Sequence, residues 1–336
     1  MAIRKLTASE YEKAAKLTGL TLPIEQTSLW LDFDSQLPGR KPLGLFAYQP
    51  EKASQPVALF AMTMYAQPRY KMIWIKHGPV WTKSPTSAMV LSFIKDFKQY
   101  IATNFAEVTF VRLNLPKGRH KYTRASLHRV MYDQTVIIDL SKSDEERLAD
   151  MTRNGRRDLR KAWKASLITK ELTEVNSTNF TPIYAILEET ASRDNFGIHT
   201  KNLYITMLSA LKEKARLYIV YQKNKPLAWA LVTISDGGAV YYYGASSQEA
   251  RRLNASYQLQ WDIMQKLKSE GIQTYDFMGI ASSGHQHLKN VSVFKEKFSH
   301  STVEISPSYD IVFQPARYKL LSVLRKTRQK IRFYST

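Results

Sequence analysis

The sequence contains no cysteine among its 336 residues. This absence excludes disulfide scaffolds, thiolate metal sites, iron–sulfur clusters and a cysteine nucleophile. It also fits a protein of a reducing compartment. Short repeats, low-complexity tracts and glycine/serine linkers are absent as well, so nothing in the composition predicts long flexible connections.

The chain also lacks a hydrophobic run long enough to cross a bilayer. Its longest uncharged stretch, 53–68, includes Gln55, Thr63 and Gln67, whereas a membrane helix needs about 20 predominantly apolar residues. The N-terminal segment carries charges but no apolar core of a signal peptide. We therefore expect a cytoplasmic protein.

Acidic residues are few. Lys and Arg number 49 against 29 Asp and Glu, which gives a formal net charge of +20. Hydrophobic residues make up 44% of the chain and aromatics 12%, enough to predict a packed core. The charge favours an anionic partner, and nucleic acid, anionic lipid and a phosphorylated substrate all remain open.

The pattern of helices and strands repeats once along the chain and predicts two mixed α/β domains. We place the first domain at 1–140 and the second at 141–305, with 306–336 returning to the first. The first domain has the helices 7–17 and 87–105 and the strands 42–47, 56–65, 70–75, 108–115 and 130–140. Ser141 or Ser143 can cap the first helix of the second domain, because three acidic residues follow.

A strongly basic helix is predicted at 152–166. Its Arg and Lys side chains cover an arc of about 140° at 100° per residue, and only Asp158 offsets them within the helix. Such a face suits a run of phosphates, as on RNA; the alternative is a solvated helix face. The residues concerned are Arg153, Arg156, Arg157, Arg160, Lys161 and Lys164.

The C-terminal segment 316–334 predicts an amphipathic basic helix. Leu320, Leu324 and Ile331 form one apolar stripe. This helix could dock on the body of the protein and present its charges, or lie on an anionic membrane face. Its basic residues are Arg317, Lys319, Arg325, Lys326, Arg328, Lys330 and Arg332.

The segment 239–261 runs from a strand through a loop into a helix. Acyl-coenzyme A acetyltransferases bind the cofactor pyrophosphate at such a place, where glycine lets the backbone approach the phosphate. Here Asn254 and Ser256 follow Arg251 at the positions where small residues are expected. The sequence therefore predicts that the shape of the region is kept while the grip on coenzyme A is lost.

Metal and hydrolase sites are not indicated. The seven histidines are scattered, and the pair His285 and His287 lacks a second ligand motif. No spacing supports a Ser–His–Asp arrangement. We expect no metal.

Eight short motifs, taken in order over residues 26–298, resemble the FemABX family of aminoacyl-tRNA-dependent transferases that build peptidoglycan cross-bridges. The likeness comes from their order and spacing rather than from a single signature. They are QTSLW (26–30), KHGPVW (76–81), RNGRRDLRKA (153–162), SRDNFGIHTKNLY (192–204), ARLYIVYQKNKPLAWALV (215–232), YYYGASS…SYQLQW (241–261), YDFMGI (275–280) and VFKEKF (293–298).

The resemblance implies two tandem GNAT-like domains with no coenzyme A. Some family members carry a long helical hairpin within the second domain. The sequence shows no such hairpin, so the chain looks like the compact members. The resemblance assigns Lys295 near the reacting ester and Arg216 to the nucleotide diphosphate. By the same resemblance, Asp276 is a second catalytic candidate and Tyr257 is a substrate-binding candidate. Trp30, Lys76 and Arg193 are the further substrate-binding candidates.

Two positions depart from the family pattern. Compact members have a phosphate-binding lysine shortly after the motif tryptophan, but Asp32 and Asp34 stand here after Trp30, so the role is unfilled or passes to Arg40 or Lys41. The Arg-x-Asp of the first domain is Arg-Leu-Asn at 112–114. An amide at this position cannot act as a general base.

The implied reaction adds an amino acid from aminoacyl-tRNA to the stem-peptide amine of a peptidoglycan precursor. The acceptor is UDP-MurNAc-pentapeptide or its lipid-linked form, and aminoacyl-tRNA is a co-substrate rather than a cofactor. We expect a monomer, with peripheral contact at the anionic inner face of the plasma membrane. A coenzyme A-dependent N-acetyltransferase and a non-catalytic RNA-binding protein are the alternatives.

Overall fold

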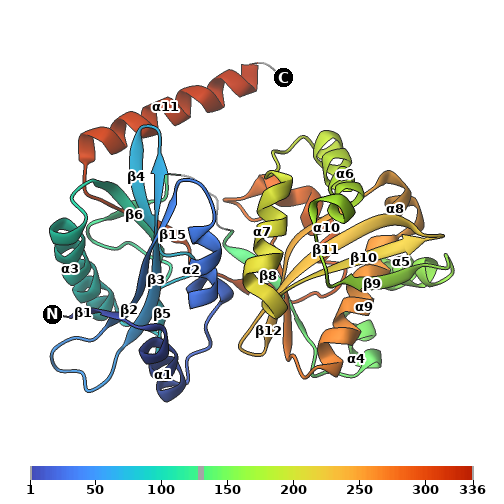
Figure 1. Cartoon of the computed structure of the whole chain (residues 1–336), viewed down its shortest axis with the longest axis horizontal. Helices are drawn as coiled ribbons and strands as arrows, with labels where there is room; N and C mark the ends of the chain where they lie inside the picture. The colour runs from blue at the N-terminus through green and yellow to red at the C-terminus, as the bar shows by residue number, and fades with distance from the viewer. Residues whose placement is uncertain (1, 128–131, 335–336) are drawn as a thin grey trace. The chain divides into compact units, whose positions relative to one another are not determined.

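The computed structural model describes residues 2–127 and 132–334, without the side chains of His287 and of residues 326–334. The chain forms two compact units. Unit 1 comprises Met1–Met131 and Ser306–Thr336, and unit 2 comprises Tyr132–Ile305. Each unit is a mixed α/β structure built on one sheet (Figure 1).

Unit 1 contains an eight-stranded sheet in the order β1-β2-β3-β4-β6-β15-β7, with β5 paired to β3. Its strands are β1 (Ile3–Leu6), β2 (Arg40–Tyr48), β3 (Ala58–Gln67), β4 (Tyr70–Trp74), β5 (Val80–Trp81), β6 (Val108–Asn114), β7 (Thr123–Ala125) and β15 (Ser308–Val312). Its helices are α1 (Ala8–Thr18), η1 (Ile24–Gln26), α2 (Ser28–Ser35), α3 (Ser87–Asn104) and α11 (Pro315–Tyr334).

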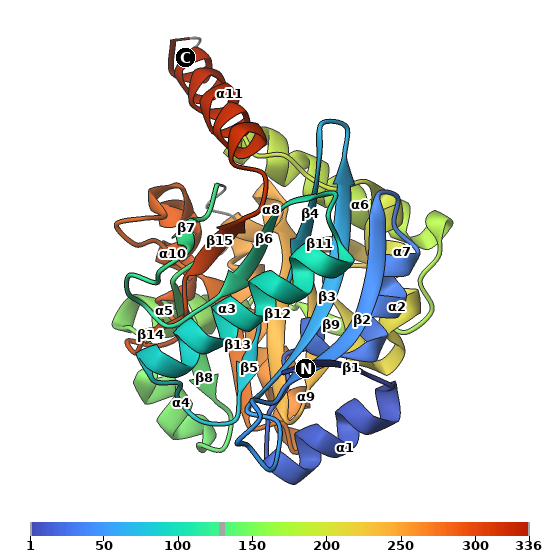
Figure 2. The same cartoon turned by 90° about the vertical axis from the view of Figure 1, so that its left-hand side faces the viewer.

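The parallel pair of this sheet is β4 and β6, and α3 makes the crossover between them. Helix α3 lies across one face of the sheet (Figure 2). Its buried side chains Phe93 and Phe97 stack on each other and meet Phe60 of β3 edge-on. This aromatic contact closes the core of unit 1.

The final segment of the chain completes the sheet of unit 1. Strand β15 lies between β6 and β7 and is antiparallel to both. Asp310 of β15 accepts two hydrogen bonds from Arg112 of β6, at 2.9 and 3.0 Å, and both residues are buried. Unit 1 therefore depends on residues almost two hundred positions apart in the sequence.

Unit 2 contains a seven-stranded sheet in the order β14-β8-β13-β12-β11-β10-β9. Its strands are β8 (Gln134–Asp139), β9 (Ile168–Leu172), β10 (Ala215–Gln222), β11 (Lys225–Ser235), β12 (Gly238–Ser246), β13 (Thr274–Gly279) and β14 (Val303–Glu304). Its helices are α4 (Asp144–Asp150), α5 (Arg153–Trp163), α6 (Ser177–Asp194), α7 (Lys201–Leu211), η2 (Lys212–Lys214), α8 (Gln248–Leu253), α9 (Ala255–Ser269), η3 (Gln286–Leu288) and α10 (Lys289–Lys295).

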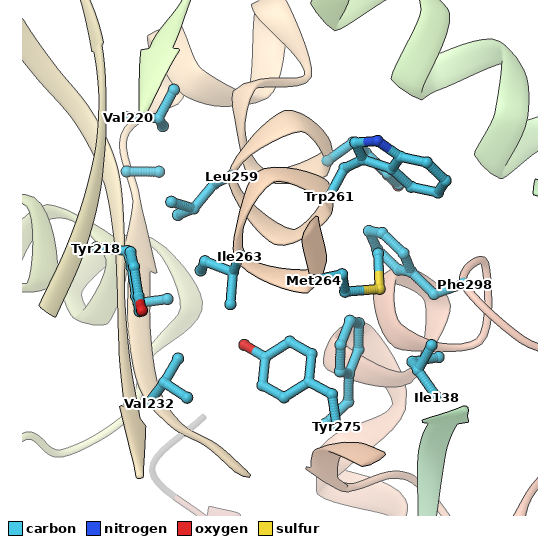
Figure 3. Close-up of a cluster of buried hydrophobic side chains, with 14 of the residues drawn as sticks. Ile138, Tyr218, Val220, Val232, Leu259, Trp261, Ile263, Met264, Tyr275 and Phe298 are labelled. Carbon is cyan, nitrogen blue, oxygen red and sulfur yellow. The ribbon is translucent and has the colours of Figure 1, made fainter. Parts of the chain in front are cut away.

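The core of unit 2 forms around α9. Leu259 and Ile263 of this helix point toward Tyr218, Val220 and Val232 of the sheet (Figure 3). Trp261 and Met264 belong to the same buried cluster, so both are core residues. The helix is held to the sheet by apolar contact on one side, as its spacing of apolar residues predicts.

The boundary between the units lies earlier than the sequence suggested. Strand β8, which we expected at the end of the first domain, pairs with β13 and β14 of the second sheet. The units divide between 131 and 132 rather than at 140. Hydrophobic alternation shows that a strand exists but cannot show which sheet it joins. The first two residues of the expected strand 130–140 lie outside the described residues.

Candidate functional site

A pocket opens in unit 2 at the end of β12. Strands β12 and β13 are parallel and pair only from Gly238 to Val240 and from Thr274 to Asp276, whereas β12 continues to Ser246 paired with β11. The pocket has a volume of about 730 Å³ and is lined by residues from the end of β12 and from α5, α6, α8, α9 and α10. The crevice beyond the ends of parallel strands is the usual ligand site of such sheets.

Lys295 is the buried cation of this region. It ends α10 and is only 7% exposed; its neighbours Phe294 and Lys297 line the pocket, whereas Lys295 itself lies behind them and is not a lining residue. Its Nζ donates a hydrogen bond of 2.9 Å to the carbonyl oxygen of Gly279. Burial lowers the pKa of Lys295 to about 8, and the nearby carboxylate of Asp276 opposes this shift. The protonation of Lys295 is therefore sensitive to pH near neutrality.

Asp276 holds the backbone that positions Lys295. Its Oδ1 accepts hydrogen bonds from the N–H of Met278, at 2.6 Å, and from the hydroxyl of Thr135. The β8–β13 register is irregular between Asp276 and Gly279, and Met278 has φ +59°. The carboxylate thus stabilises a bend that presents the Gly279 carbonyl to Lys295.

Tyr257 of α9 lies in an aromatic cluster beside the pocket. Its ring stacks on Phe298 at 5.5 Å and meets Phe294 edge-on at 5.0 Å. Burial raises the pKa of its hydroxyl, and the Lys297 ammonium opposes this shift. Tyr257 also lines the pocket. The FKEKF segment is therefore fixed by its two phenylalanines against α9.

The basic helix α5 is joined directly to the segment that carries Lys295. Thr152, the residue that caps α5, donates its N–H to the carbonyl of Lys297 at 3.1 Å. A Cβ added to Gly155 would lie 2.4 Å from that same oxygen, so the close approach requires glycine. Lys297 Nζ in turn donates to Asp158 Oδ2 at 2.7 Å. A ligand that binds α5 would therefore act on the residues next to Lys295.

The predicted RNA-binding residues of α5 divide into two groups. Arg156 donates to the carbonyl oxygens of Leu148 and Ala149, each at 3.2 Å, and so caps the end of α4. Arg157 pairs with Asp158 at 3.2 Å. Among the described residues of the segment 153–164, four exposed cations form no ion pair: Arg153, Arg160, Lys161 and Lys164. A hollow of about 730 Å³ is lined by Arg153, Asn154, Arg156, Arg157 and Arg160.

The positions at which the sequence pattern places a cofactor pyrophosphate, Arg251, Asn254 and Ser256, lie where α8 ends and α9 begins, and all three line the pocket. At the start of α8, the backbone is bound by a carboxylate of the protein itself. Oε1 of Glu189 accepts the N–H of Gln248 at 2.7 Å, and the Ser247 hydroxyl caps Ala250. Asn254 separates α8 from α9 with φ +58°, a backbone conformation that glycine or asparagine adopts most easily. The backbone shape of an acetyltransferase is retained, but a cofactor phosphate would compete with Glu189 for Gln248.

Arg193 joins the end of α6 to the end of β12. Its Nη1 donates to the Ser246 carbonyl at 3.0 Å, and its other nitrogens bind both oxygens of Asp194. Both residues line the pocket. The hydrogen bond from Arg193 lowers the pKa of Asp194. The guanidinium therefore reaches the pocket already paired to a carboxylate.

Arg216 lies elsewhere in unit 2, at the start of β10. It binds Glu270 at 2.5 Å and approaches Glu171 at 4.0 Å. Arg216 does not line the pocket described above. A diphosphate would have to displace these two carboxylates. The sequence did not reveal their contacts with Arg216, because Glu270 comes from the end of α9 and Glu171 from β9.

Trp30 and Lys76 lie together in unit 1. The Lys76 ammonium is 4.6 Å from the centre of the Trp30 ring, and burial lowers the pKa of this lysine. Arg40, one alternative for the missing phosphate-binding lysine, is bound to Asp34 at 2.7 Å. Lys41, the other alternative, is exposed.

One cluster was missed by sequence reasoning. Asp133 and Ser282 both contact Nδ1 of His285, at 3.2 and 3.3 Å. Because they share one ring nitrogen, the three residues cannot form a relay through the imidazole. Among the described residues no group of three or more His, Asp or Glu side chains could hold a metal ion. The side chain of His287 lies outside that description.

The chain is similar in sequence to a family that includes aminoacyltransferases. A family model described as the FemAB family matches residues 119–223 and 219–326. The aminoacyltransferase FemA of Staphylococcus aureus is 23% identical over 123 residues, which are 36% of this chain and 29% of FemA. The chain therefore matches less than a third of that relative's length.

Three solved structures share the fold. A crystal structure of FemX has a TM-score of 0.75 at 15% identity and covers 96% of this chain and 100% of its own. A tandem GNAT protein from the clavulanic acid pathway has a TM-score of 0.53 at 11% identity, with 93% and 98% covered. The C-terminal domain of a lysylphosphatidylglycerol synthetase from Agrobacterium fabrum has 0.54 at 13% identity, with 95% and 97% covered. The two mixed α/β units are thus a tandem GNAT-type fold.

Proposed function

The chain belongs to the FemAB family, and we propose that it transfers an amino acid from aminoacyl-tRNA to a stem-peptide amine of a peptidoglycan precursor. The observation that carries this proposal is the junction between α5 and the FKEKF segment. It joins a helix with unpaired cations to a buried lysine beside a pocket. A polyanionic carrier with a reactive end needs both features.

The acyl end of the carrier is proposed to occupy the pocket at the end of β12. The acceptor amine attacks the ester carbonyl carbon, a C–N bond forms, and the bond to the terminal ribose oxygen breaks. The amine loses one proton and the ribose oxygen gains one, so the transfer needs no oxidant or covalent enzyme intermediate. Alignment and stabilisation of the oxyanion can supply most of the acceleration.

Lys295 is proposed to stabilise the oxyanion or the terminal ribose. A cation fixed in a buried site interacts more strongly with a developing negative charge than it would in water. Asp276 acts as a positioning residue, because its Oδ1 already accepts the Met278 N–H and the Thr135 hydroxyl. Tyr257 and Arg193 are proposed to contact the acyl group or the terminal nucleotide, since both line the pocket.

The donor is proposed to be tRNA rather than coenzyme A. Asn254 and Ser256 stand where the acetyltransferase pattern has small residues, and Glu189 accepts the Gln248 N–H at the start of α8. A carboxylate at that helix start repels a pyrophosphate. In contrast, the four unpaired cations of α5 have no internal partner to lose when a phosphate backbone binds. These features support tRNA over coenzyme A as the donor.

The acceptor is proposed to be UDP-MurNAc-pentapeptide or its lipid-linked form, with the third-position lysine of the stem as the attacking amine. Trp30 and Lys76 are proposed to bind this acceptor in unit 1. Arg216, in unit 2, would bind a diphosphate only by exchanging Glu270 for a phosphate oxygen. We propose that the protein acts as a monomer on the cytoplasmic side, where nucleotide-linked precursors and charged tRNAs are made. No helix among the described residues is long and apolar enough to cross a membrane.

The test is to incubate the purified protein with UDP-MurNAc-pentapeptide and a mixture of charged tRNAs, and to measure the peptide mass. We expect the mass to increase by one or more amino-acid residues, and the increase to disappear when the tRNAs are deacylated. Acetyl-coenzyme A in place of the tRNAs should give no product. Acetylation of the peptide, or tRNA binding without transfer to either form of the acceptor, would refute the proposal.

A further inference from the structure

Helix α11 is attached to unit 1 at its beginning. Tyr318 is buried, and its hydroxyl donates to Asp310 at 2.9 Å. Its ring meets Phe110 edge-on at 5.3 Å, and Leu321 packs on the same cluster. Tyr318 and Leu321 therefore form the side of α11 that faces the protein.

A second set of apolar side chains on α11 faces water. Leu320 is 57% exposed and Val323 is 53% exposed. They are three residues apart, so they are neighbours on the helix surface. Neither contributes to the cluster around Tyr318. Figure 2 shows α11 extending away from the strands of unit 1, and an exposed aliphatic pair on such a helix indicates a contact surface.

The charge of the segment identifies the kind of surface that fits. Residues 316–336 include seven Lys and Arg and no Asp or Glu. Lys319, next to Leu320, is exposed. RNA would attract the charges but would gain little from Leu320 and Val323. An anionic bilayer accommodates both, because apolar side chains enter the acyl boundary while cations remain at the headgroups.

We propose that α11 is a peripheral membrane-binding helix that recognises the surface of an anionic phospholipid bilayer. Leu320 and Val323 insert into the interface, and the basic residues of the segment provide the attraction to acidic headgroups. This surface is separate from the pocket of unit 2 and from the proposed reaction. Its test therefore uses no measurement of turnover.

The experiment is sedimentation of the full-length protein with vesicles. One preparation contains phosphatidylcholine alone, and the other contains phosphatidylcholine with an equal amount of phosphatidylglycerol. We expect binding to the second preparation and weak or no binding to the first. The binding should decrease as salt is added, because salt screens the headgroup charge.

Two variants, each with a matched control, separate the contribution of the apolar side chains to vesicle binding from that of the basic side chains. Leu320→Glu with Val323→Glu should lower the vesicle affinity roughly tenfold or more. The control Leu17→Glu with Ile168→Glu replaces two aliphatic residues that are 66% and 59% exposed and changes the charge equally, so it should bind far better. Replacing Lys319, Lys326 and Lys330 by Gln should cost about fivefold per lysine; the control replaces Lys13, Lys16 and Lys52.

Three results would overturn the proposal. The first is equal binding to the neutral and anionic vesicles. The second is an equal effect of the α11 variants and their controls, which would show a general effect of charge. The third is loss of tRNA binding in the Leu320 and Val323 variant while vesicle binding persists, which would make α11 an RNA-binding surface. Circular dichroism of each variant verifies that it is folded.

Discussion

At the scale of single residues, the chemistry of the site depends on how burial changes Lys295. A lysine in water is protonated at neutral pH, but this side chain is enclosed, and its pKa falls to about 8. The sequence placed Lys295 in a family motif, whereas its exposure and its contact with Gly279 became visible only in the structure. The burial indicates a function because enclosing a charge is costly, and the Gly279 carbonyl and the nearby Asp276 carboxylate offset this cost only in part.

Replacing Lys295 by alanine should lower kcat about 10²- to 10³-fold, the usual loss for one oxyanion donor. Binding of deacylated tRNA should change little, because the cations of α5 remain. The measurement is single-turnover transfer together with a tRNA filter-binding assay. A parallel loss of tRNA affinity would indicate a binding role instead.

The pH profile of transfer should show the titration of Lys295. Below pH 8 the ammonium is present, and as the pH rises through about 8 it is lost, so kcat/KM should decrease on that limb. Lys295→Arg keeps the charge at every accessible pH. The decrease near pH 8 should therefore be missing in the arginine variant, whatever its absolute rate; its persistence would assign the titration to another group.

Gly155 tests the junction between α5 and the FKEKF segment. Alanine is the better helix former, but its Cβ would lie 2.4 Å from the Lys297 carbonyl oxygen. We expect Gly155→Ala to destabilise the protein by about 1–3 kcal/mol and to lower kcat. Denaturant unfolding and the transfer assay measure the two effects. Alanine at the exposed Gly197, which has no atom within 4 Å of the added Cβ, is the control.

At the scale of elements, α5 shows that a basic pattern does not make every cation available. The sequence grouped six residues on this helix, yet Arg156 caps α4 and Arg157 pairs with Asp158. A helical wheel gives the direction of a side chain, but it does not reveal a neighbouring helix end that consumes the charge. Salt dependence separates the two groups of cations.

Replacing Arg160 and Lys164 by Gln should weaken tRNA binding and reduce the slope of log K against log salt by about 1.5, since each lost phosphate contact contributes about 0.7–0.9. Replacing Lys13 and Lys16 of α1 removes the same charge and should leave the slope unchanged. Arg156→Gln should instead lower stability by about 1–2 kcal/mol, because it uncaps α4. Equal slopes in all variants would remove α5 from the RNA-binding surface.

At the scale of the whole molecule, unit 1 needs both ends of the chain. A chain ending at Ile305 lacks Asp310, so Arg112 would be left buried without its carboxylate, at a cost of about 3–5 kcal/mol. We expect this truncation to lose the cooperative unfolding of unit 1. A chain ending at Arg325 retains β15 and Tyr318 and should unfold like the full chain. Calorimetry of both truncations checks this, and a stable unit 1 in the shorter chain would contradict it.

The sequence by itself determined the class of elements, the two mixed α/β units, the excess of positive charge and the motifs of the family. Capping and hydrophobic period are local, so the cap of α1 at Thr7 and the cap of α4 at Ser143 follow from nearby residues. Even the core positions Trp261 and Met264 follow from helical spacing. These features depend on residues within a few positions of each other.

Only the tertiary structure decided which sheet β8 joins, that β15 completes unit 1, and that helices gather around the end of β12 to form a pocket. It also decided which charges are free, because Glu189, Glu270 and Asp310 reach their partners from distant parts of the chain. Pairing between strands and between buried charges depends on the register and packing of segments remote in sequence. A local sequence pattern shows which residues can donate or accept a hydrogen bond, but it does not show which distant residues they pair with.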